Sequence, residues 1–175
     1  MRRIMLTAVL FVLSGIPQTS APKSPFSIAV VPTTSRDESS TIEMARKTPR
    51  EFFVVLTNVS QQDQLVWETW NSWGYQTISF ELSTADGRKV LVSMRNQGFT
   101  VNFPGTFLIR PGEHQVFAIR LGTEWETHPS LAMKNEMPIK LKAVYEVHPT
   151  DESAQYKVWI GRIESRVYDL TLRQW

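Results

Sequence analysis

Short apolar segments that end at turn residues run along the whole chain, and this pattern restricts it to a β-rich fold. Residues 77–83 alternate strictly, with Ile78, Phe80 and Leu82 on one face and serine or glutamate on the other, as a half-buried strand requires. The other strand candidates are residues 26–31, 52–58, 90–94, 107–109, 116–121, 139–147, 156–160 and 167–172, and residues 65–67 add a short apolar segment. No helical pattern extends beyond a turn or two. Eight or nine short strands separated by turns predict an all-β fold, an antiparallel β-sandwich.

The turns and the last strands sharpen this prediction. Asp86-Gly87 readily adopts the positive φ of a type I′ hairpin turn, and Pro111-Gly112 is typical of a type I or II turn. The closing strand, loop and strand resemble the last hairpin of an immunoglobulin-like fold, in which Tyr145 would be the tyrosine-corner residue. We therefore expect an immunoglobulin-like β-sandwich with a polar loop at residues 148–155.

Residues 1–21 have the composition of a secretory signal peptide. Arg2 and Arg3 precede an apolar run from Ile4 to Leu13, and small and polar residues follow up to Ala21. That order is typical of an export signal, and the run is shorter than the about 20 residues that a membrane-spanning helix needs. We expect cleavage near Ala21 and an exported chain, periplasmic or extracellular, with no membrane span after cleavage. Retention of the leader as an uncleaved anchor is the alternative.

The remainder divides into an N-terminal segment, residues 22–49, and a β-sandwich domain, residues 50–175. The N-terminal segment begins with the strand candidate 26–31. Residues 33–49 are then rich in serine, threonine and charge, which is typical of a linker or long loop. Within this stretch, residues 42–45 (Ile-Glu-Met-Ala) allow one helical turn.

Charge and cysteine content exclude several classes of function. Lys and Arg total 19 against 17 Asp and Glu, but two of the basic residues belong to the leader, which leaves 17 of each sign. A neutral chain without a basic run does not favour nucleic-acid binding. Without cysteine there is no disulfide, no thiolate nucleophile and no Cys-based zinc site. An exported domain of this kind must rely on its apolar core, for which about 150 residues suffice.

Residues 67–75, Trp-Glu-Thr-Trp-Asn-Ser-Trp-Gly-Tyr, are the most distinctive local feature. A tryptophan at every third position fits a 3₁₀ or helical turn, or a wide loop that folds back on the sandwich. Such rings either plug the open end of a sandwich or form an exposed platform for sugar rings or partner side chains. Trp67 and Trp73 favour the plug, whereas Trp70, between polar neighbours, fits both roles. The predicted binding residues are Trp67, Trp70, Asn71, Trp73 and Tyr75, with Phe99 and Phe103 from the aromatic stretch 99–107.

This segment resembles a family of uncharacterised secreted proteins from planctomycete-type bacteria. The resemblance covers about residues 50–170 and rests on residues 65–75, 78–82, 86–87, 102–104, 111–113 and 158–165. It implies a single exported β-domain and carries no established activity or binding residues. The strand ending in Thr-Asn and the later Pro-Gly-Glu turn are also similar to small β-sandwich proteinase inhibitors of bacilli.

Residue types suited to catalysis are scarce. The chain has three histidines, no cysteine and no Gly-x-Ser-x-Gly motif, so neither a zinc hydrolase nor a serine hydrolase is well supplied. Acid pairs such as Glu68 and Glu81 have no evident cleft for glycoside hydrolysis. Glu124, Glu126 and His128 share one face of an extended segment, but their spacing matches no known metal motif, and a solvated rim explains them. We expect no catalytic residue, no metal and no cofactor.

Together these features favour an exported, non-catalytic immunoglobulin-like module that binds or assembles with a protein or glycan of the cell envelope. One alternative is a secreted proteinase inhibitor that inserts residues 98–105 or 148–155 into a protease. Another is a carbohydrate-binding module that uses the tryptophan-rich loop.

Overall fold

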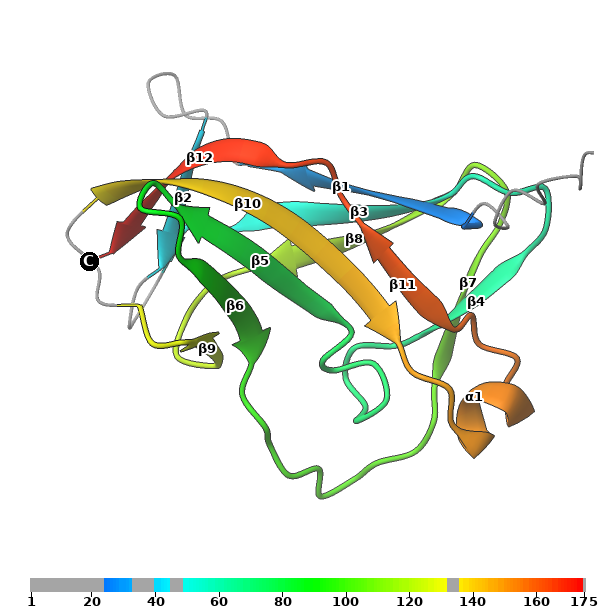
Figure 1. The fold of residues 1–175 in the computed structure, drawn as a ribbon. Coiled ribbons are helices and arrows are strands. Elements are labelled where there is room, and N and C mark those ends of the chain that lie inside the picture. The colour runs from blue at the N-terminus through cyan, green and yellow to red at the C-terminus, as the bar shows by residue number, and fades with distance from the viewer. Residues whose placement is uncertain (1–23, 33–39, 45–48, 132–135, 175) are drawn as a thin grey trace, which may run out of the picture.

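Twelve strands and one short helix make up the described part of this computed structural model, residues 24–32, 40–44, 49–131 and 136–174 (Figure 1). The elements are β1 (Phe26–Val31), β2 (Thr41–Met44), β3 (Phe52–Asn58), β4 (Gln64–Trp67), β5 (Ile78–Thr84), β6 (Lys89–Met94), β7 (Thr106–Ile109), β8 (His114–Ile119), β9 (Trp125–His128), β10 (Glu136–Val147), α1 (Asp151–Gln155), β11 (Gly161–Glu164) and β12 (Tyr168–Gln174). The predicted all-β class is confirmed, with more strands than the eight or nine expected.

Strand pairing arranges these elements around one core. The smaller sheet has the order β1-β3-β8, and the larger has the order β2-β12-β10-β5-β6-β9, with β11 alongside β10; β4 and β7 form a separate pair. The larger sheet curls, and its long strand β10 arches across the molecule (Figure 1). β1 lies against β10 and β11, so the sheets meet along that side. This open half-barrel confirms the all-β class without establishing the finer immunoglobulin-like sandwich.

Alternation along the strands builds the core. On β5 the residues at 78, 80 and 82 are buried and those between them are half-buried, as predicted. The fully buried Phe80 packs against Phe52 and Trp125, with ring centroids 5.4 and 5.5 Å away. Rings of this size bury about 150–250 Å² each. The described core is therefore built largely from aromatic and branched side chains, which a chain without disulfides requires.

The N-terminal segment contributes strands to both main sheets. β1 pairs antiparallel with β3, and β2 pairs parallel with β12. The helical turn that residues 42–45 would allow is not seen at residues 42–44, which lie in β2, where the buried Ile42 pairs with Leu172. This parallel pair also makes the larger sheet mixed instead of purely antiparallel. The expected leader (1–21) and most of the expected linker (33–39 and 45–48) lie outside the described residues.

The two predicted turns form with different geometries. Gly87 has a φ of 82°, but neither Ala85 nor Asp86 has a positive φ, so the type I′ prediction is wrong. Ser83 pairs with Lys89, and the longer loop needs only Gly87 in the left-handed region. At the other turn, Gly112 has a φ of 79°, which selects type II from the two alternatives.

The chain between β10 and β11 departs from the predicted loop and strand. Thr150 and Ser153 form a reciprocal capping box that begins α1. The strand expected at 156–160 is wrong, because Lys157 has a φ of 55° and Trp159 turns inward to stack on Tyr145, with ring centroids 5.9 Å apart. The strand begins instead at Gly161, whose φ of 141° suits glycine.

Tyr145 is a core residue near the end of β10 and does not form the predicted tyrosine corner. Its side chain is fully buried, and its hydroxyl lies near Thr77 but outside regular hydrogen-bond geometry. Burial raises the pKa of this hydroxyl well above its ordinary value. Its ring stacking on Trp159 therefore accounts for its place in the fold.

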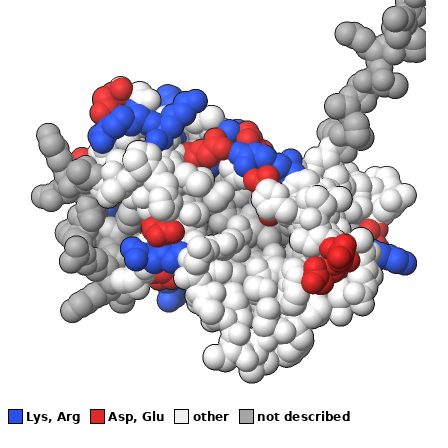
Figure 2. Space-filling model, turned by 60° about the horizontal axis from the view of Figure 1, so that its bottom comes forward, with Lys and Arg blue, Asp and Glu red and all other residues white. Residues whose placement is uncertain are grey.

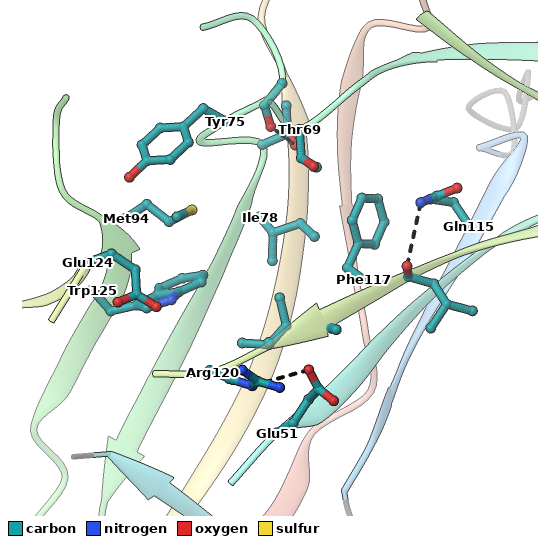
Figure 3. A pocket seen from close by; sticks show the side chains of 15 residues that line it. Glu51, Thr69, Tyr75, Ile78, Met94, Gln115, Phe117, Arg120, Glu124 and Trp125 are labelled. Carbon is teal, nitrogen blue, oxygen red and sulfur yellow. Dashed lines mark hydrogen bonds and ion pairs between the residues drawn. The ribbon is translucent and has the colours of Figure 1, made fainter. Parts of the chain in front are cut away.

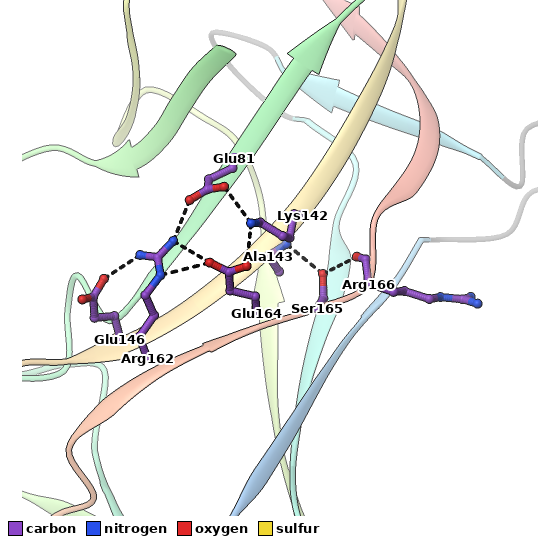
Figure 4. Close-up of polar contacts among 8 residues, drawn as sticks. All are labelled: Glu81, Lys142, Ala143, Glu146, Arg162, Glu164, Ser165 and Arg166. Carbon is purple, nitrogen blue, oxygen red and sulfur yellow. Dashed lines mark hydrogen bonds and ion pairs between the residues drawn. The ribbon is translucent and has the colours of Figure 1, made fainter. Parts of the chain in front are cut away.

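A ladder of five charged side chains lies on the outer face of β5, β10 and β11 (Figure 4). Lys142 Nζ lies 2.9 Å from Glu81 and 2.6 Å from Glu164. Arg162 pairs with Glu81, Glu146 and Glu164 at 2.6, 2.8 and 3.0 Å. Strand register places Lys142 opposite Glu81 and Arg162 opposite Glu146, so cross-strand neighbours carry opposite charges.

Candidate binding surface

Two loops at one end of the half-barrel form the exposed aromatic surface. Residues 68–77 join β4 to β5, and residues 95–105 join β6 to β7 and hang below the sheets in Figure 1. Trp70 and Phe103 are 46% and 57% exposed, and their rings meet edge to face with centroids 4.8 Å apart. Ser72 and Asn102 join the same two loops through hydrogen bonds of 3.0 and 2.8 Å. We call the surface of these four residues the aromatic platform.

A buried asparagine fixes the loop beneath the platform. Asn71 donates from Nδ2 to the carbonyl of Gly105 at 3.1 Å and accepts the Gly74 N–H at 2.9 Å. The backbone carbonyl of Asn71 accepts a further hydrogen bond from the Tyr75 N–H at 3.0 Å. Because this amide is fully buried, losing any of these bonds would leave an unsatisfied polar group. Asn71, one of the predicted binding residues, therefore holds the two loops together from a fully buried position.

Two glycines allow the close approach of these loops. A Cβ atom on Gly74 would lie 2.1 Å from the Glu68 carbonyl oxygen, which belongs to the backbone. A Cβ atom on Gly105 would lie 2.3 Å from Glu68 Oε2 and 3.0 Å from the Trp70 ring. The same Glu68 carboxylate accepts a short hydrogen bond from Trp70 Nε1. Small residues at these positions thus determine where the Trp70 ring lies.

Trp67 and Trp73 act as the plug that the sequence favours. Trp67 is 3% exposed and packs against Trp73 and Tyr156, with centroids 5.8 Å away in both cases. Trp73 is half-buried against the same core. The tryptophans at positions 67, 70 and 73 therefore do not share one face, because the segment folds as a wide loop and not as a regular helical turn.

Tyr75 and Phe99 form a second contact between the two loops. Their rings are perpendicular, with centroids 5.5 Å apart, and both residues are half-buried. Partial burial and the nearby Glu124 carboxylate raise the pKa of the Tyr75 hydroxyl. The structure therefore brings Trp70 to Phe103 and Tyr75 to Phe99, while Trp67, Asn71 and Trp73 support them from below.

The platform is surrounded by uncharged residues. Residues 69–80 and 96–109 contain no Asp, Glu, Lys or Arg, and instead supply hydroxyls, amides and aromatic rings. Figure 2 shows a broad face free of charged side chains at the end that carries the 95–105 loop. Such a surface can stack against a ring and exchange hydrogen bonds.

The acidic segment near β9 brings one carboxylate close to a histidine ring. Glu126 and His128 lie 3.1 Å apart, as expected for neighbours on one strand face. Within the described ranges no group of three or more His, Cys, Asp or Glu side chains could hold a metal ion. Among the same residues, no helix has the length and apolar character to cross a membrane.

Comparison with family models, with curated proteins and with solved structures finds no match to this chain. The resemblance to secreted planctomycete-type proteins therefore stays a prediction from the sequence. The function has to be inferred from the geometry of the surface itself.

Sequence reasoning missed the polar half of the platform. Ser72, Asn102 and Glu68 position the exposed rings but carry no motif of their own. The sequence does contain one indication of this surface, the long stretches without charged residues at 69–80 and 96–109. Such stretches differ from a solvated rim, which is charged, and from a core, which is apolar throughout.

Proposed function

We propose that this chain is an exported, non-catalytic binding module of the cell envelope, and that the aromatic platform is its contact surface. The observation that carries the proposal is the exposed edge-to-face pair of Trp70 and Phe103, held in place by hydrogen bonds between two loops. Exposed aromatic side chains on a rigid support bind partners at low entropic cost.

Export and the finer fold belong to the same proposal. The basic start and short apolar run of residues 1–13 support a cleaved leader and a periplasmic or extracellular location. The mostly antiparallel sheets of short strands support an immunoglobulin-like module, in which loops at one end carry recognition. The partner is then a protein or glycan of the envelope.

The test is retention of the purified protein on immobilised envelope extract. Trp70→Ala should lower retention by about tenfold or more, as expected for a central interface tryptophan. Ile160→Ala is the matched control, because it removes another half-exposed apolar side chain outside both loops. Equal retention of wild type and a folded Trp70→Ala variant would exclude the platform as the contact surface.

A carbohydrate ligand is the first alternative, favoured by the hydroxyl and amide groups of Ser72 and Asn102 beside the two rings. Sugars stack on aromatic faces and exchange hydrogen bonds with such groups. Treating the extract with periodate would abolish retention of a glycan-binding module, whereas treatment with protease would abolish retention of a protein-binding one.

A secreted proteinase inhibitor is the second alternative. Val101, directly before the platform residues Asn102 and Phe103, is 68% exposed, as a residue inserted into a protease would be. The other loop considered, residues 148–155, contains α1 and is therefore less suited to extended insertion. Absence of inhibition across a protease panel at micromolar protein would exclude this alternative.

A further inference from the structure

The outer strand of the smaller sheet has an open edge. β8 pairs with β3 on one side, and among the described residues no strand pairs with its other side. Asn58 exchanges backbone hydrogen bonds with Glu113 and Gly112 at 3.0 and 2.9 Å. Because backbone groups alternate in direction along a strand, this anchor turns the N–H and C=O of Val116 and Ala118 away from β3.

A side-chain hydrogen bond on β8 also indicates that this edge is open. The Gln115 side chain donates to the Val116 carbonyl at 3.5 Å, along an otherwise exposed strand edge. A glutamine folding back on its own strand is a weak substitute for a ladder partner. The edge thus presents a short row of donors and acceptors that an added strand could satisfy.

A cleft of about 520 Å³ lies along this edge, within the about 300–1,000 Å³ typical of ligand sites. Figure 3 shows Tyr75, Met94 and Trp125 facing β8 across the cleft, with Ile78 and Phe117 at its base. None of the four platform residues lines this cleft.

The charge at the cleft mouth identifies the occupant more closely. Arg120 is paired with Glu51 at 3.3 Å, so that cation is already compensated. Glu124 is exposed at the opposite wall, near Tyr75, and forms no ion pair with another described residue. The cleft therefore combines an apolar base with two acidic side chains, of which Glu51 is paired with Arg120 and Glu124 is available to a ligand.

We propose that this cleft binds an extended peptide segment of a partner protein, which adds a strand to β8 and places a Lys or Arg side chain against Glu124. Strand addition supplies hydrogen bonds through Val116 and Ala118, and alternate apolar side chains of the peptide contact Ile78 and Phe117. This site is independent of the aromatic platform, so either proposal can fail alone.

The test uses a displayed library of random twelve-residue peptides, selected on the full chain and measured by fluorescence polarisation. Ala118→Pro removes one outward N–H and leaves the hydrogen bonds between β8 and β3 in place, as prolines on edge strands do. This variant should bind the selected peptides with about tenfold lower affinity. Ala118→Ser is its matched control. Glu124→Lys should weaken them by a similar factor, whereas the charge reversal Asp63→Lys, on an exposed loop outside the cleft, should not.

Hydrogen exchange keeps the proposal testable even if Ala118→Pro does not fold. Bound peptide should protect the amides of Val116 and Ala118, and the selected sequences should carry a Lys or Arg. Failure to enrich any peptide, or equal binding to folded Ala118→Pro, would overturn the proposal. So would a wild-type dimer that becomes monomeric in Ala118→Pro, because the edge would then pair with a second copy.

Discussion

Buried asparagine side chains hold two of the loops in place, and Asn58 does so at the end of β3. Its Nδ2 donates to the carbonyls of Gln62 and Ile109 at 2.7 and 2.8 Å, and its Oδ1 accepts the Ser60 N–H at 2.9 Å. Asn71 has the same role beneath the aromatic platform. In both cases one side chain satisfies backbone groups from distant segments, which an apolar residue could not do.

Asn58→Ala should lower the free energy of unfolding by about 1–3 kcal/mol, because it leaves the buried Ile109 carbonyl without its donor. Urea denaturation measures this loss. Gln62→Ala is the control, since only the backbone carbonyl of Gln62 takes part and its side chain is exposed. Its effect should stay within about 0.5 kcal/mol, and an equal loss in both variants would contradict this role for Asn58.

Three glycine-to-alanine changes should separate stability from the position of the platform. Gly74→Ala forces a Cβ atom into the Glu68 backbone and should cost about 1–3 kcal/mol or more. Gly105→Ala meets the movable ends of Glu68 and Trp70, so the melting temperature should change little while the exposed tryptophan becomes differently accessible to acrylamide. Gly98→Ala has open space around it and should leave both readouts unchanged. Large destabilisation by Gly105→Ala would show that the platform is rigid.

Among the elements, β5, β10 and β11 are linked by the charged ladder, and this link should depend on pH. Hydrogen bonding to Lys142 is the main cause that lowers the pKa of both Glu81 and Glu164. A carboxyl whose pKa is lower in the folded state stabilises the fold above its unfolded pKa of about 4.5. That contribution is lost as the pH falls through the lowered folded value. The free energy of unfolding should therefore decrease as the pH falls below about 4.5.

Lys142→Met should reduce stability at neutral pH by at most about 1 kcal/mol, since the carboxylates are partly exposed and screened by salt. The difference from wild type should shrink at pH 2–3, where the carboxyls are protonated in both proteins. Thermal melts at both pH values measure it. Lys140→Met is the control, because it removes a single pair with the exposed Asp169, and its effect should be smaller. A difference that grows in acid would contradict the ladder's role.

Patterns within one element could be predicted from the sequence, and pairings between distant elements could not. The alternation of β5 and β10 and the Pro111-Gly112 turn depend on neighbouring residues, so their form follows from local chemistry. The strand expected at 156–160 does not form, because Trp159 turns inward to stack on Tyr145, a residue of a distant strand. The contact of Trp70 with Phe103 likewise requires two loops to meet. A sequence pattern names such residues as candidates without showing which of them meet.

For the whole molecule, the N-terminal strands are part of the core. Phe26 packs edge to face on Trp159 at 5.4 Å, and the Val30 N–H donates to the Tyr168 hydroxyl at 3.0 Å. A fragment of residues 50–175 should therefore fail to fold, although the sequence suggests a domain with those bounds. Near-ultraviolet circular dichroism compares it with a fragment of residues 24–175. A native-like spectrum from the shorter fragment would show that β1 and β2 are dispensable.

The position of β12 sets the order of events during synthesis. It follows all the other described strands in the sequence, yet it lies between β2 and β10 and not at the margin of its sheet. Until it arrives, β2 has no neighbour in that sheet and one side of β10 stays open. The complete larger sheet can therefore form only after residues 168–174 have been made, and its folding depends on contacts between segments far apart in the sequence.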